Sequence, residues 1–344
     1  MLIKRTIYIF IIIIAFAGYK AVVIYKKAFM PNIRLVNRSQ DYILIPTGSK
    51  YTDVYNIIEN KIFIEDKESF NWTALKKNYP NHIKAGRFKI TNGMSNNELI
   101  NILRSGKQEP VELTFNNIRT LSQLAGRVSE EIEVDSIKLL NLFHSPEIQA
   151  KYGFNDNNII SIFIPNTYEF FWNTSEVQFI DRMNREYDNF WNKDRLTKAA
   201  GLHMTKEQVV TLASIINEET DRNDEKARIA GVYINRLNKK IRLQADPTVI
   251  YVVGDFTLQR VLRKYYQIDS PYNTYIYGGL PPGPICIPEI SSIDAVLNYE
   301  KHDYLYFCAR SDFSGYHIFA RSLEAHNNNA QIYRRELNKR KIYR

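Results

Sequence analysis

The sequence contains only two cysteines, Cys286 and Cys308, in 344 residues. So few cysteines exclude a fold held together by several disulfides and a zinc site built from several thiolates. The sequence also lacks internal repeats and low-complexity runs, and its single long apolar segment excludes a polytopic membrane protein. Hydrophobic residues make up 44% and charged residues 24%, ordinary values for a globular chain of about two domains.

Acidic residues are absent from positions 1–27, which carry five basic residues. Residues 331–344 carry six basic residues and one acid, so the net charge of +9 is concentrated at the two ends. The remaining body, residues 28–330, has a net charge of −1. Because a nucleic-acid-binding protein has a basic face on its folded body, we expect no nucleic-acid partner.

Residues 6–25 form one apolar segment that only Lys20, near its end, interrupts. The segment has the ~20 residues that a helix needs to cross a bilayer, and a lysine near a helix end can extend its amine to the interface. The tail 1–5 is basic, which the positive-inside rule places in the cytoplasm. We therefore expect a single-pass anchor in the cell inner (cytoplasmic) membrane, with the rest of the chain on the periplasmic or extracytoplasmic side.

A cleaved signal peptide is the alternative interpretation of this segment. Ala15-Phe16-Ala17 resembles a small-x-small cleavage site. Apolar character resumes at Ala21, however, which favours the uncleaved anchor. Export would also allow Cys286 and Cys308 to form a disulfide, a question that the sequence leaves open.

The exported part begins with a polar stretch, and we expect an irregular linker over 26–39. Short alternating elements then predict a small α/β module over 40–108, with strands at 42–45 and 84–90. Within this module, Ser95-Asn96-Asn97-Glu98 is a capping box that predicts the start of a helix.

From residue 109 the pattern changes to longer predicted helices, the strongest at about 205–222 and 224–239. We expect a mixed α+β domain with a groove over 109–335, followed by a basic tail at 336–344. The fold class predicted for the whole chain is therefore α+β.

The predicted helix at 205–222 ends with two adjacent glutamates. At about 100° per residue, its apolar side chains define one face; Glu219 lies about 70° from the centre of that face and Glu218 about 170°. We expect Glu218 to face solvent and Glu219 to lie at the margin of the buried stripe. Burial raises the pKa of a carboxylic acid, as a general acid working near neutral pH requires. The alternative is that Glu219 forms an ion pair with Arg222 or Arg228.

A series of motifs surrounds this helix. They are Lys84-Ala85-Gly86-Arg87-Phe88, Ile164-Pro165-Asn166-Thr167-Tyr168, Leu212-Ala213-Ser214-Ile215-Ile216-Asn217-Glu218-Glu219-Thr220, Ala230-Gly231-Val232-Tyr233-Ile234-Asn235-Arg236-Leu237, Leu243-Gln244-Ala245-Asp246-Pro247-Thr248, Tyr272-Asn273-Thr274-Tyr275, Gly279-Leu280-Pro281-Pro282-Gly283, Tyr304-Leu305-Tyr306-Phe307, His317-Ile318-Phe319 and Leu323-Glu324-Ala325-His326-Asn327. In type and order they resemble those of the MltG (YceG-like) family of membrane-anchored endolytic murein transglycosylases, over nearly the whole chain.

Three positions depart from the family pattern. Asn217 and Glu218 stand where the family has Glu and Lys, and Asn166 stands where it has Asp. The family's catalytic glutamate falls on Glu219, the residue that the helical periodicity also selects.

The resemblance implies cleavage, without water, of the β-1,4 bond between N-acetylmuramic acid and N-acetylglucosamine in nascent peptidoglycan strands, which limits strand length during cell wall synthesis. Glu219 would protonate the glycosidic oxygen and then deprotonate the muramic C6 hydroxyl, giving a 1,6-anhydro end. An ordinary glycosidase uses two carboxylates, but here the nucleophile belongs to the substrate. No cofactor is implied, and without an H-E-x-x-H motif or a Cys/His pair we expect no metal site.

Candidate substrate-binding residues lie in these motifs. Side-chain amides suit sugar hydroxyl and acetamido groups, aromatic rings suit sugar faces, and an aspartate that Pro247 holds extended can orient a neighbour or support developing positive charge. The candidates are Gln244, Asp246, Tyr272, Asn273, Tyr275, His317, Phe319 and Asn327.

Structural roles are the alternatives for several of these residues. Asp246 could cap a turn, Tyr272 and Tyr275 could be core or groove wall, and His317, like His326, could be a structural hydrogen-bonding residue. For Arg236, in the motif after the glutamate helix, we expect an ion pair within the core.

The module at 40–108 resembles the LysM-like module of the family, which implies that it contacts glycan or positions the catalytic domain; a purely structural role is the alternative. Expected partners are glycan strands, the membrane and peptidoglycan synthases. Two rival functions remain open, namely a non-catalytic peptidoglycan-binding scaffold and a muramidase-type hydrolase.

Overall fold

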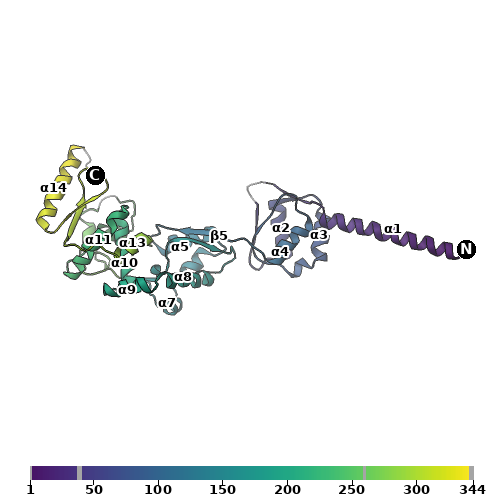
Figure 1. Cartoon of the computed structure of the whole chain (residues 1–344), viewed down its shortest axis with the longest axis horizontal. Coiled ribbons are helices and arrows are strands. Elements are labelled where there is room, and N and C mark those ends of the chain that lie inside the picture. The colour runs from purple at the N-terminus through teal and green to yellow at the C-terminus, as the bar shows by residue number, and fades with distance from the viewer. Residues whose placement is uncertain (1, 37–40, 259–260, 341–344) are drawn as a thin grey trace. The chain divides into compact units, whose positions relative to one another are not determined.

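The computed structural model describes residues 2–36, 41–258 and 261–340, and the chain divides into two compact units (Figure 1). The first unit comprises Met1–Leu113, Glu131–Val134 and Glu169–Ser175, and the second comprises Thr114–Glu130, Asp135–Tyr168 and Glu176–Arg344. The elements of the first unit are α1 (Leu2–Phe29), β1 (Ile33–Leu35), β2 (Tyr42–Ile45), α2 (Tyr51–Lys61), β3 (Ile62–Ile64), α3 (Lys67–Lys76), a 3₁₀ turn at Tyr79–Asn81, β4 (Gly86–Lys89) and α4 (Asn96–Ser105).

Helix α1 contains the apolar segment expected to be an anchor. Its stretch Arg5–Phe29 is long and apolar enough to cross a membrane, and it is the one such helix in the described part of the chain. At its C-terminal end, Ala28 is buried, and the side chain of Asn96 donates a 2.9 Å hydrogen bond to the carbonyl of Lys27. Since the last carbonyls of a helix have no partner within it, this bond fixes the end of α1 to α4.

The linker predicted over 26–39 is wrong for residues up to Leu35. Helix α1 continues to Phe29, and β1 pairs antiparallel with β3, with Ile33 opposite Ile64. A strand of three residues is too short to show a periodicity of two, so no pattern in the sequence could indicate it. Positions 37–40 lie outside the described residues.

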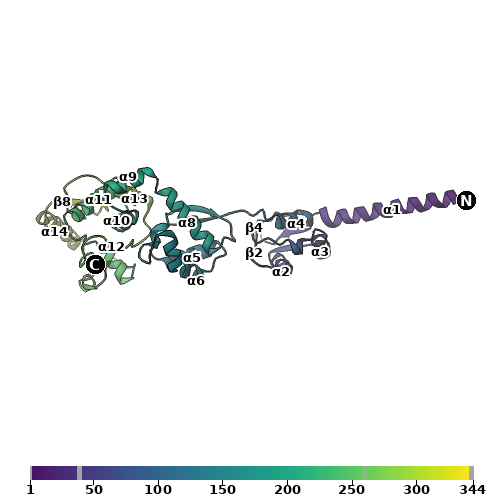
Figure 2. The same ribbon diagram turned by 90° about the horizontal axis from the view of Figure 1, so that it is seen from below.

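The rest of the first unit follows the sequence prediction. The strands expected at 42–45 and 84–90 pair antiparallel as β2 and β4. The capping box is confirmed, because Ser95 and Glu98 each bind the other's backbone N–H, and α4 ends at Gly106 with a φ of 71°. Figure 2 shows α2, α3 and α4 beside these strands. Apolar side chains from all these elements form one core, which holds the module together.

The second unit is mostly helical, and in it β7 (Tyr306–Ala309) pairs antiparallel with β8 (His317–Ala320). The strands β5 (Val111–Phe115) and β6 (Asn166–Phe170) also pair, and of them Thr114–Phe115 and Asn166–Tyr168 belong to this unit. The helices are α5 (Leu121–Glu131), α6 (Ser136–Phe143), α7 (Pro146–Tyr152), α8 (Glu176–Phe190), α9 (Lys193–Gly201), α10 (Lys206–Glu219), α11 (Asn223–Asn238), α12 (Asp246–Val253), α13 (Ile290–Leu297) and α14 (Leu323–Lys339), with 3₁₀ turns at Ile159–Ile162 and Tyr265–Gln267. The mixed α+β class is thus confirmed.

Helix α10 is the buried centre of this unit and confirms the helix expected at 205–222. Thr205 begins it with a capping box to Gln208, and all side chains from Val209 to Ile216 are buried. It packs against α11, which confirms the helix expected at 224–239, and against α13 (Figure 2). Burying a large aliphatic side chain contributes about 1.5–3 kcal/mol, so the end of α10, at Glu219, is held firmly in place.

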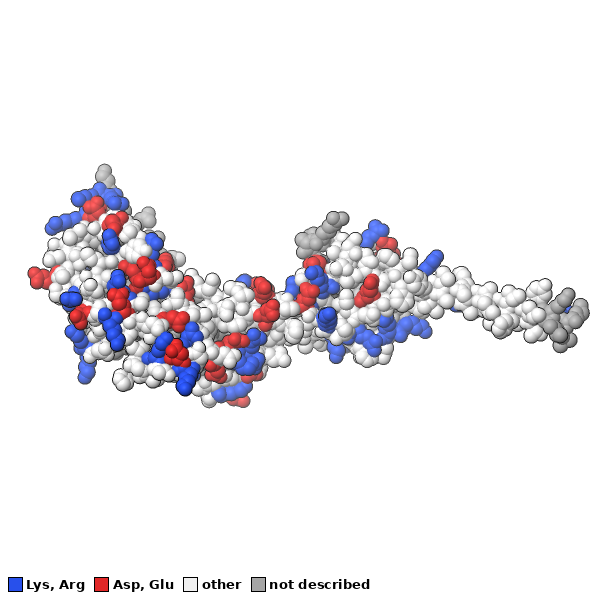
Figure 3. All heavy atoms as spheres, viewed as in Figure 1, with Lys and Arg blue, Asp and Glu red and all other residues white. Residues whose placement is uncertain are grey.

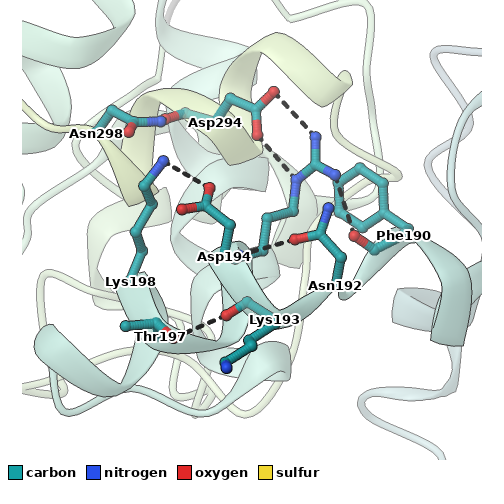
Figure 4. A network of polar contacts seen from close by, with 9 residues as sticks. Phe190, Asn192, Lys193, Asp194, Thr197, Lys198, Asp294 and Asn298 are labelled. Atoms are coloured by element: carbon teal, nitrogen blue, oxygen red, sulfur yellow. Dashed lines mark hydrogen bonds and ion pairs between the residues drawn. The ribbon is translucent and has the colours of Figure 1, made fainter.

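A network of polar contacts links helices α8, α9 and α13 (Figure 4). Arg195 of α9 donates from Nε and Nη2 to the carboxylate of Asp294 in α13, at 3.1 and 3.3 Å. Its Nη1 donates at 3.0 Å to the carbonyl of Phe190, the last residue of α8, and its guanidinium lies 4.0 Å from the centre of the Phe190 ring. This one side chain therefore links α8, α9 and α13.

Charged residues are distributed over the second unit without separation by sign on the face that Figure 3 draws, where basic and acidic side chains are interspersed. This mixture agrees with the near-zero net charge of residues 28–330. Both cysteines are free, and Cys286 is buried.

Candidate active site

Glu219 is the last residue of α10, and its Oε1 accepts a 2.6 Å hydrogen bond from the hydroxyl of Tyr233 in α11. Burial raises the pKa of Glu219 to about 7, and the negative charges of Asp246 and Glu218 act in the same direction, whereas the Tyr233 bond lowers it. Burial dominates because it disfavours the charged form of the acid. The raised pKa expected from the sequence is therefore present.

The ion pair considered as an alternative for Glu219 is not formed. Arg222 donates instead to the carbonyl of Ser314 at 2.7 Å, and Arg228 pairs with Glu300 at 3.0 Å. Without a cation holding it ionised, Glu219 can carry a proton near neutral pH.

The prediction that Glu218 faces solvent is wrong. Its carboxylate forms an ion pair of 2.5 Å with Arg119, and its side chain is only 13% exposed. The helical periodicity describes only the apolar pattern of α10. It cannot indicate that Arg119, far away in the sequence, pairs with Glu218 on the polar side of the helix. Asn217, the third polar residue here, accepts hydrogen bonds from the N–H of Glu289 and the hydroxyl of Ser292. Asn217 and Glu218 thus have structural partners.

Tyr233 is a site residue that the sequence reasoning missed. Burial raises its pKa well above the usual value, so its hydroxyl stays protonated and remains a donor. Its ring packs edge-to-face on Phe307, with centroids 5.8 Å apart, and Phe307 packs in the same way on His317 at 5.3 Å. The only signal for Tyr233 in the sequence was its place in the motif at 230–237.

Two cavities meet at Glu219. The first, of about 450 Å³, is lined by Glu219, Val232, Tyr233, Arg236, Leu243, Gln244, Asp246, Tyr275, Leu305, Tyr306, Phe307, Cys308, Ala309, His317, Leu323 and His326. The second, of about 490 Å³, is lined by Glu219, Thr220, Asp221, Arg222, Ala309, Arg310, Phe313, Gly315, Tyr316, His317 and Tyr333. Because both include Glu219 and His317, a long ligand can extend to either side of the acid.

Gln244, Asp246, Tyr275 and His317 are the predicted binding residues that the structure brings together with Glu219. Oε1 of Gln244 accepts a 2.6 Å hydrogen bond from Arg236, which also donates to the carbonyls of Arg242 and Leu305. The ion pair expected for Arg236 is therefore replaced by bonds to neutral acceptors. The guanidinium fixes the segment that presents Gln244 to the cavity.

Asp246 does not have the extended conformation expected before Pro247. It is the first residue of α12, where a proline in the first turn is well tolerated because that N–H needs no helical partner. Its Oδ1 accepts hydrogen bonds from the hydroxyls of Tyr275 at 2.5 Å and Tyr266 at 3.1 Å. These two tyrosines hold the carboxylate at the cavity wall.

The other four predicted binding residues do not line either cavity. Asn273 is fully buried, and its side chain binds the carbonyls of Tyr266 and Ile268 and the N–H of Tyr275, so it shapes the loop that carries Tyr275. Tyr272 packs on Tyr251, with ring centroids 4.9 Å apart. Phe319 packs against Tyr304 and Phe307, and Asn327 is exposed on α14.

A carboxylic acid that holds its proton near neutral pH, placed between two ligand-sized cavities, is the arrangement of an enzyme that works by acid catalysis. The profile of the YceG-like family matches residues 43–332, and the chain therefore belongs to that family.

Relatives and a solved structure support this assignment. An endolytic murein transglycosylase of Bacillus subtilis (strain 168) is 29% identical over 325 residues, covering 90% of this chain and 89% of that protein. An endolytic murein transglycosylase of Streptococcus pneumoniae serotype 2 (strain D39) is 27% identical over 315 residues, 83% of this chain and 57% of that protein. A crystal structure described as a yceG-like protein from Listeria monocytogenes has 31% identity and a TM-score of 0.57, covering 83% of this chain and 97% of that one.

Proposed function

We propose that the chain is an endolytic lytic transglycosylase that cuts the bond between N-acetylmuramic acid and N-acetylglucosamine in peptidoglycan strands. One observation carries the proposal: Glu219, with a pKa of about 7, lies where two cavities meet. An acid in that position can protonate a bond in the interior of a strand that continues on both sides. The similarity to two endolytic murein transglycosylases supports the same activity.

The reaction needs few protein groups. Glu219 gives its proton to the glycosidic oxygen as the bond to muramic C1 breaks, and the C6 hydroxyl of the same sugar attacks C1 and closes a 1,6-anhydro ring. The carboxylate left on Glu219 is one acceptor for the C6 proton. Because the nucleophile comes from the substrate, the reaction consumes no water, and such cuts would limit strand length during wall synthesis.

The cavity walls suit a sugar strand. Gln244 offers an amide to hydroxyl or acetamido groups, and Tyr275 offers an aromatic ring at the same wall. Asp246, held by two tyrosine hydroxyls, is placed to stabilise positive charge that develops at C1. Of the remaining candidates, Asn273 and Phe319 support the wall residues Tyr275 and Phe307, and sugar binding by Tyr272 and Asn327 stays a prediction.

The helix α1 supports a location at the membrane. We propose that it is an uncleaved single-pass anchor in the cytoplasmic membrane, with the basic tail inside and the rest of the chain outside. The module at 40–108 would act as a LysM-like part that positions the catalytic domain, 109–335, near newly made strands. Peptidoglycan synthases are the partners that such a position favours.

A muramidase-type hydrolase is the second candidate, because a second carboxylate, Asp246, lines the same cavity as Glu219. A hydrolase of this kind uses a pair of carboxylates and a water molecule. The products distinguish the two reactions, since hydrolysis leaves a reducing muramic end and the transglycosylase leaves the anhydro form, lighter by one water.

The experiment is digestion of purified glycan strands by the full chain in detergent, with mass spectrometry of the products. We expect anhydro ends from the wild type, none from Glu219→Gln, and unchanged activity from Glu130→Gln, a surface control paired with Arg127. Reducing ends would favour the hydrolase. Strand binding without any cut would favour a scaffold, and equal products from Glu219→Gln and wild type would overturn the role of Glu219.

A further inference from the structure

Glu225 is a buried carboxylate beside the site that the proposed reaction does not yet use. It lies in the first turn of α11 and is 4% exposed. Its carboxylate accepts hydrogen bonds from His317: the backbone N–H lies 3.0 and 3.2 Å from the two carboxylate oxygens, and Nδ1 lies 2.9 Å from Oε2. The first turn of a helix favours negative charge, so this position suits a carboxylate.

This pairing fixes the chemistry of the His317 ring. A carboxylate accepts the hydrogen bond that Nδ1–H donates, so in this tautomer the ring has its free electron pair on Nε2. Phe307 packs edge-to-face on the ring at 5.3 Å and restricts its rotation. No protein partner of Nε2 is found within the described residues, and the side chain, 14% exposed, lines both cavities that contain Glu219.

The proposed reaction moves two protons. One passes to the oxygen that leaves C1, and the other leaves the C6 hydroxyl. Oε1 of Glu219 is occupied by the 2.6 Å bond from Tyr233, so Oε2 is the oxygen that can face the leaving group. A separate acceptor for the C6 proton would allow both transfers to occur in one concerted step.

We propose that His317 is that acceptor and that Glu225 is the positioning residue that holds it. In the step, the bond from C6 oxygen to C1 forms and the bond from C1 to the leaving oxygen breaks. The proton of Glu219 goes to the leaving oxygen, and the C6 proton goes to Nε2 of His317. The imidazolium, stabilised by Glu225, then returns a proton to Glu219 through solvent, so the cycle is balanced. This inference rests on the proposed function and assigns a second group to it.

The test uses the full chain in detergent on glycan strands, with His317→Gln and Glu225→Gln. We expect kcat to fall about 100-fold or more for His317→Gln and about tenfold or more for Glu225→Gln, with KM changed little. The fraction of cut ends that carry the anhydro form should also fall, because water competes when ring closure loses its base. Thermal melts identify variants that retain the fold.

His144→Gln is the matched control. His144 forms the same kind of pair, 2.8 Å from Asp156, but on the exposed surface, and this substitution should leave kcat and the products unchanged. A second measurement uses the variant His317→Gly. Imidazole added to this variant should restore the formation of anhydro products.

The inference is overturned if folded His317→Gln and Glu225→Gln keep kcat within about twofold, or if the loss lies in KM with an unchanged anhydro fraction. Absence of anhydro ends from the wild type would instead overturn the proposed function.

Discussion

The hydroxyl of Tyr233 donates a 2.6 Å hydrogen bond to Oε1 of Glu219, and this bond joins two consecutive helices, α10 and α11. Two opposing effects set the pKa of Glu219. The bond favours the ionised carboxylate, whereas burial favours the neutral acid, and burial prevails at a pKa of about 7. Glu219 therefore populates both forms near neutral pH, as a group that gives and recovers a proton in each cycle requires.

Tyr233→Phe tests this balance in the pH dependence of activity. The substitution removes the donor but keeps the ring, so it removes the influence that lowers the pKa of Glu219. The pKa should rise above about 7, and the decline of kcat on the basic side should move to higher pH. The measurement is a pH–rate profile of wild type and variant on glycan strands. A decline that moves to lower pH would contradict the assignment of the bond.

Glu219→Gln should stabilise the folded protein above neutral pH. In the folded state the pKa of Glu219 is raised from 4.5 to about 7, so between these values the folded state holds a proton that the unfolded state has lost. Wild-type stability therefore falls as pH rises from 4.5 through 7, by up to roughly 3 kcal/mol. Glutamine, which does not ionise, should escape this loss.

Urea unfolding of both proteins in detergent, at pH 4.5 and pH 8, checks this expectation. The variant should gain roughly 2–3 kcal/mol relative to wild type between the two pH values. A difference that stays constant with pH would mean that Glu219 is not desolvated in the folded protein.

The position of Glu219 could be predicted because local information determines it. The apolar periodicity from Val209 to Ile216 defines the buried face of α10, and a capping box at Thr205 marks its start. Both signals lie within one helix, where side-chain directions follow from sequence spacing. The raised pKa then followed from the residue's place beside that face.

The residues that the sequence reasoning misjudged depend on partners from elsewhere in the chain. Glu218 is covered by Arg119, and Asn273 is buried because two loop carbonyls, of Tyr266 and Ile268, need its amide as a donor. Neither relation leaves a periodic signal, since each comes from tertiary packing. The Tyr233 bond to Glu219 is of the same kind, because it depends on how α11 lies against α10.

Arg195→Met should destabilise the second unit without affecting catalysis. Arg195 links three helices through Asp294 and Phe190, and its removal takes this donor from the Asp294 carboxylate, whereas the Phe190 carbonyl keeps the N–H of Asn192. We expect a loss of roughly 1–2 kcal/mol in unfolding free energy and unchanged kcat. The control is Lys198→Met, which removes a surface pair with Asp194 within α9 and should cost at most about 0.5 kcal/mol. Equal losses of unfolding free energy in the two variants would show that the Arg195 contacts stabilise the unit no more than an exposed ion pair does.

Gly231→Ala should destabilise the second unit strongly, although it adds only one methyl group. Gly231 lies inside α11, and a Cβ there would lie 2.3 Å from the carbonyl oxygen of Glu300 and 2.6 Å from Nε2 of His302. The carbonyl belongs to the backbone and cannot rotate away, so α11 would have to shift. Because α11 carries Tyr233, the shift should lower kcat as well as stability. We expect a loss of roughly 2 kcal/mol or more.

Gly126→Ala is the matched control for this prediction. Gly126 also lies inside a helix, α5, but apart from its chain neighbours and the nearby backbone of that helix, no heavy atom lies within 4 Å of the position that its Cβ would occupy. Alanine is better than glycine in a helix by about 0.5–1 kcal/mol, so this substitution should stabilise the protein and leave kcat unchanged. Thermal melts and kcat of both variants give the comparison. If Gly231→Ala were also neutral or stabilising, α11 would not be packed closely against the segment at 300–302.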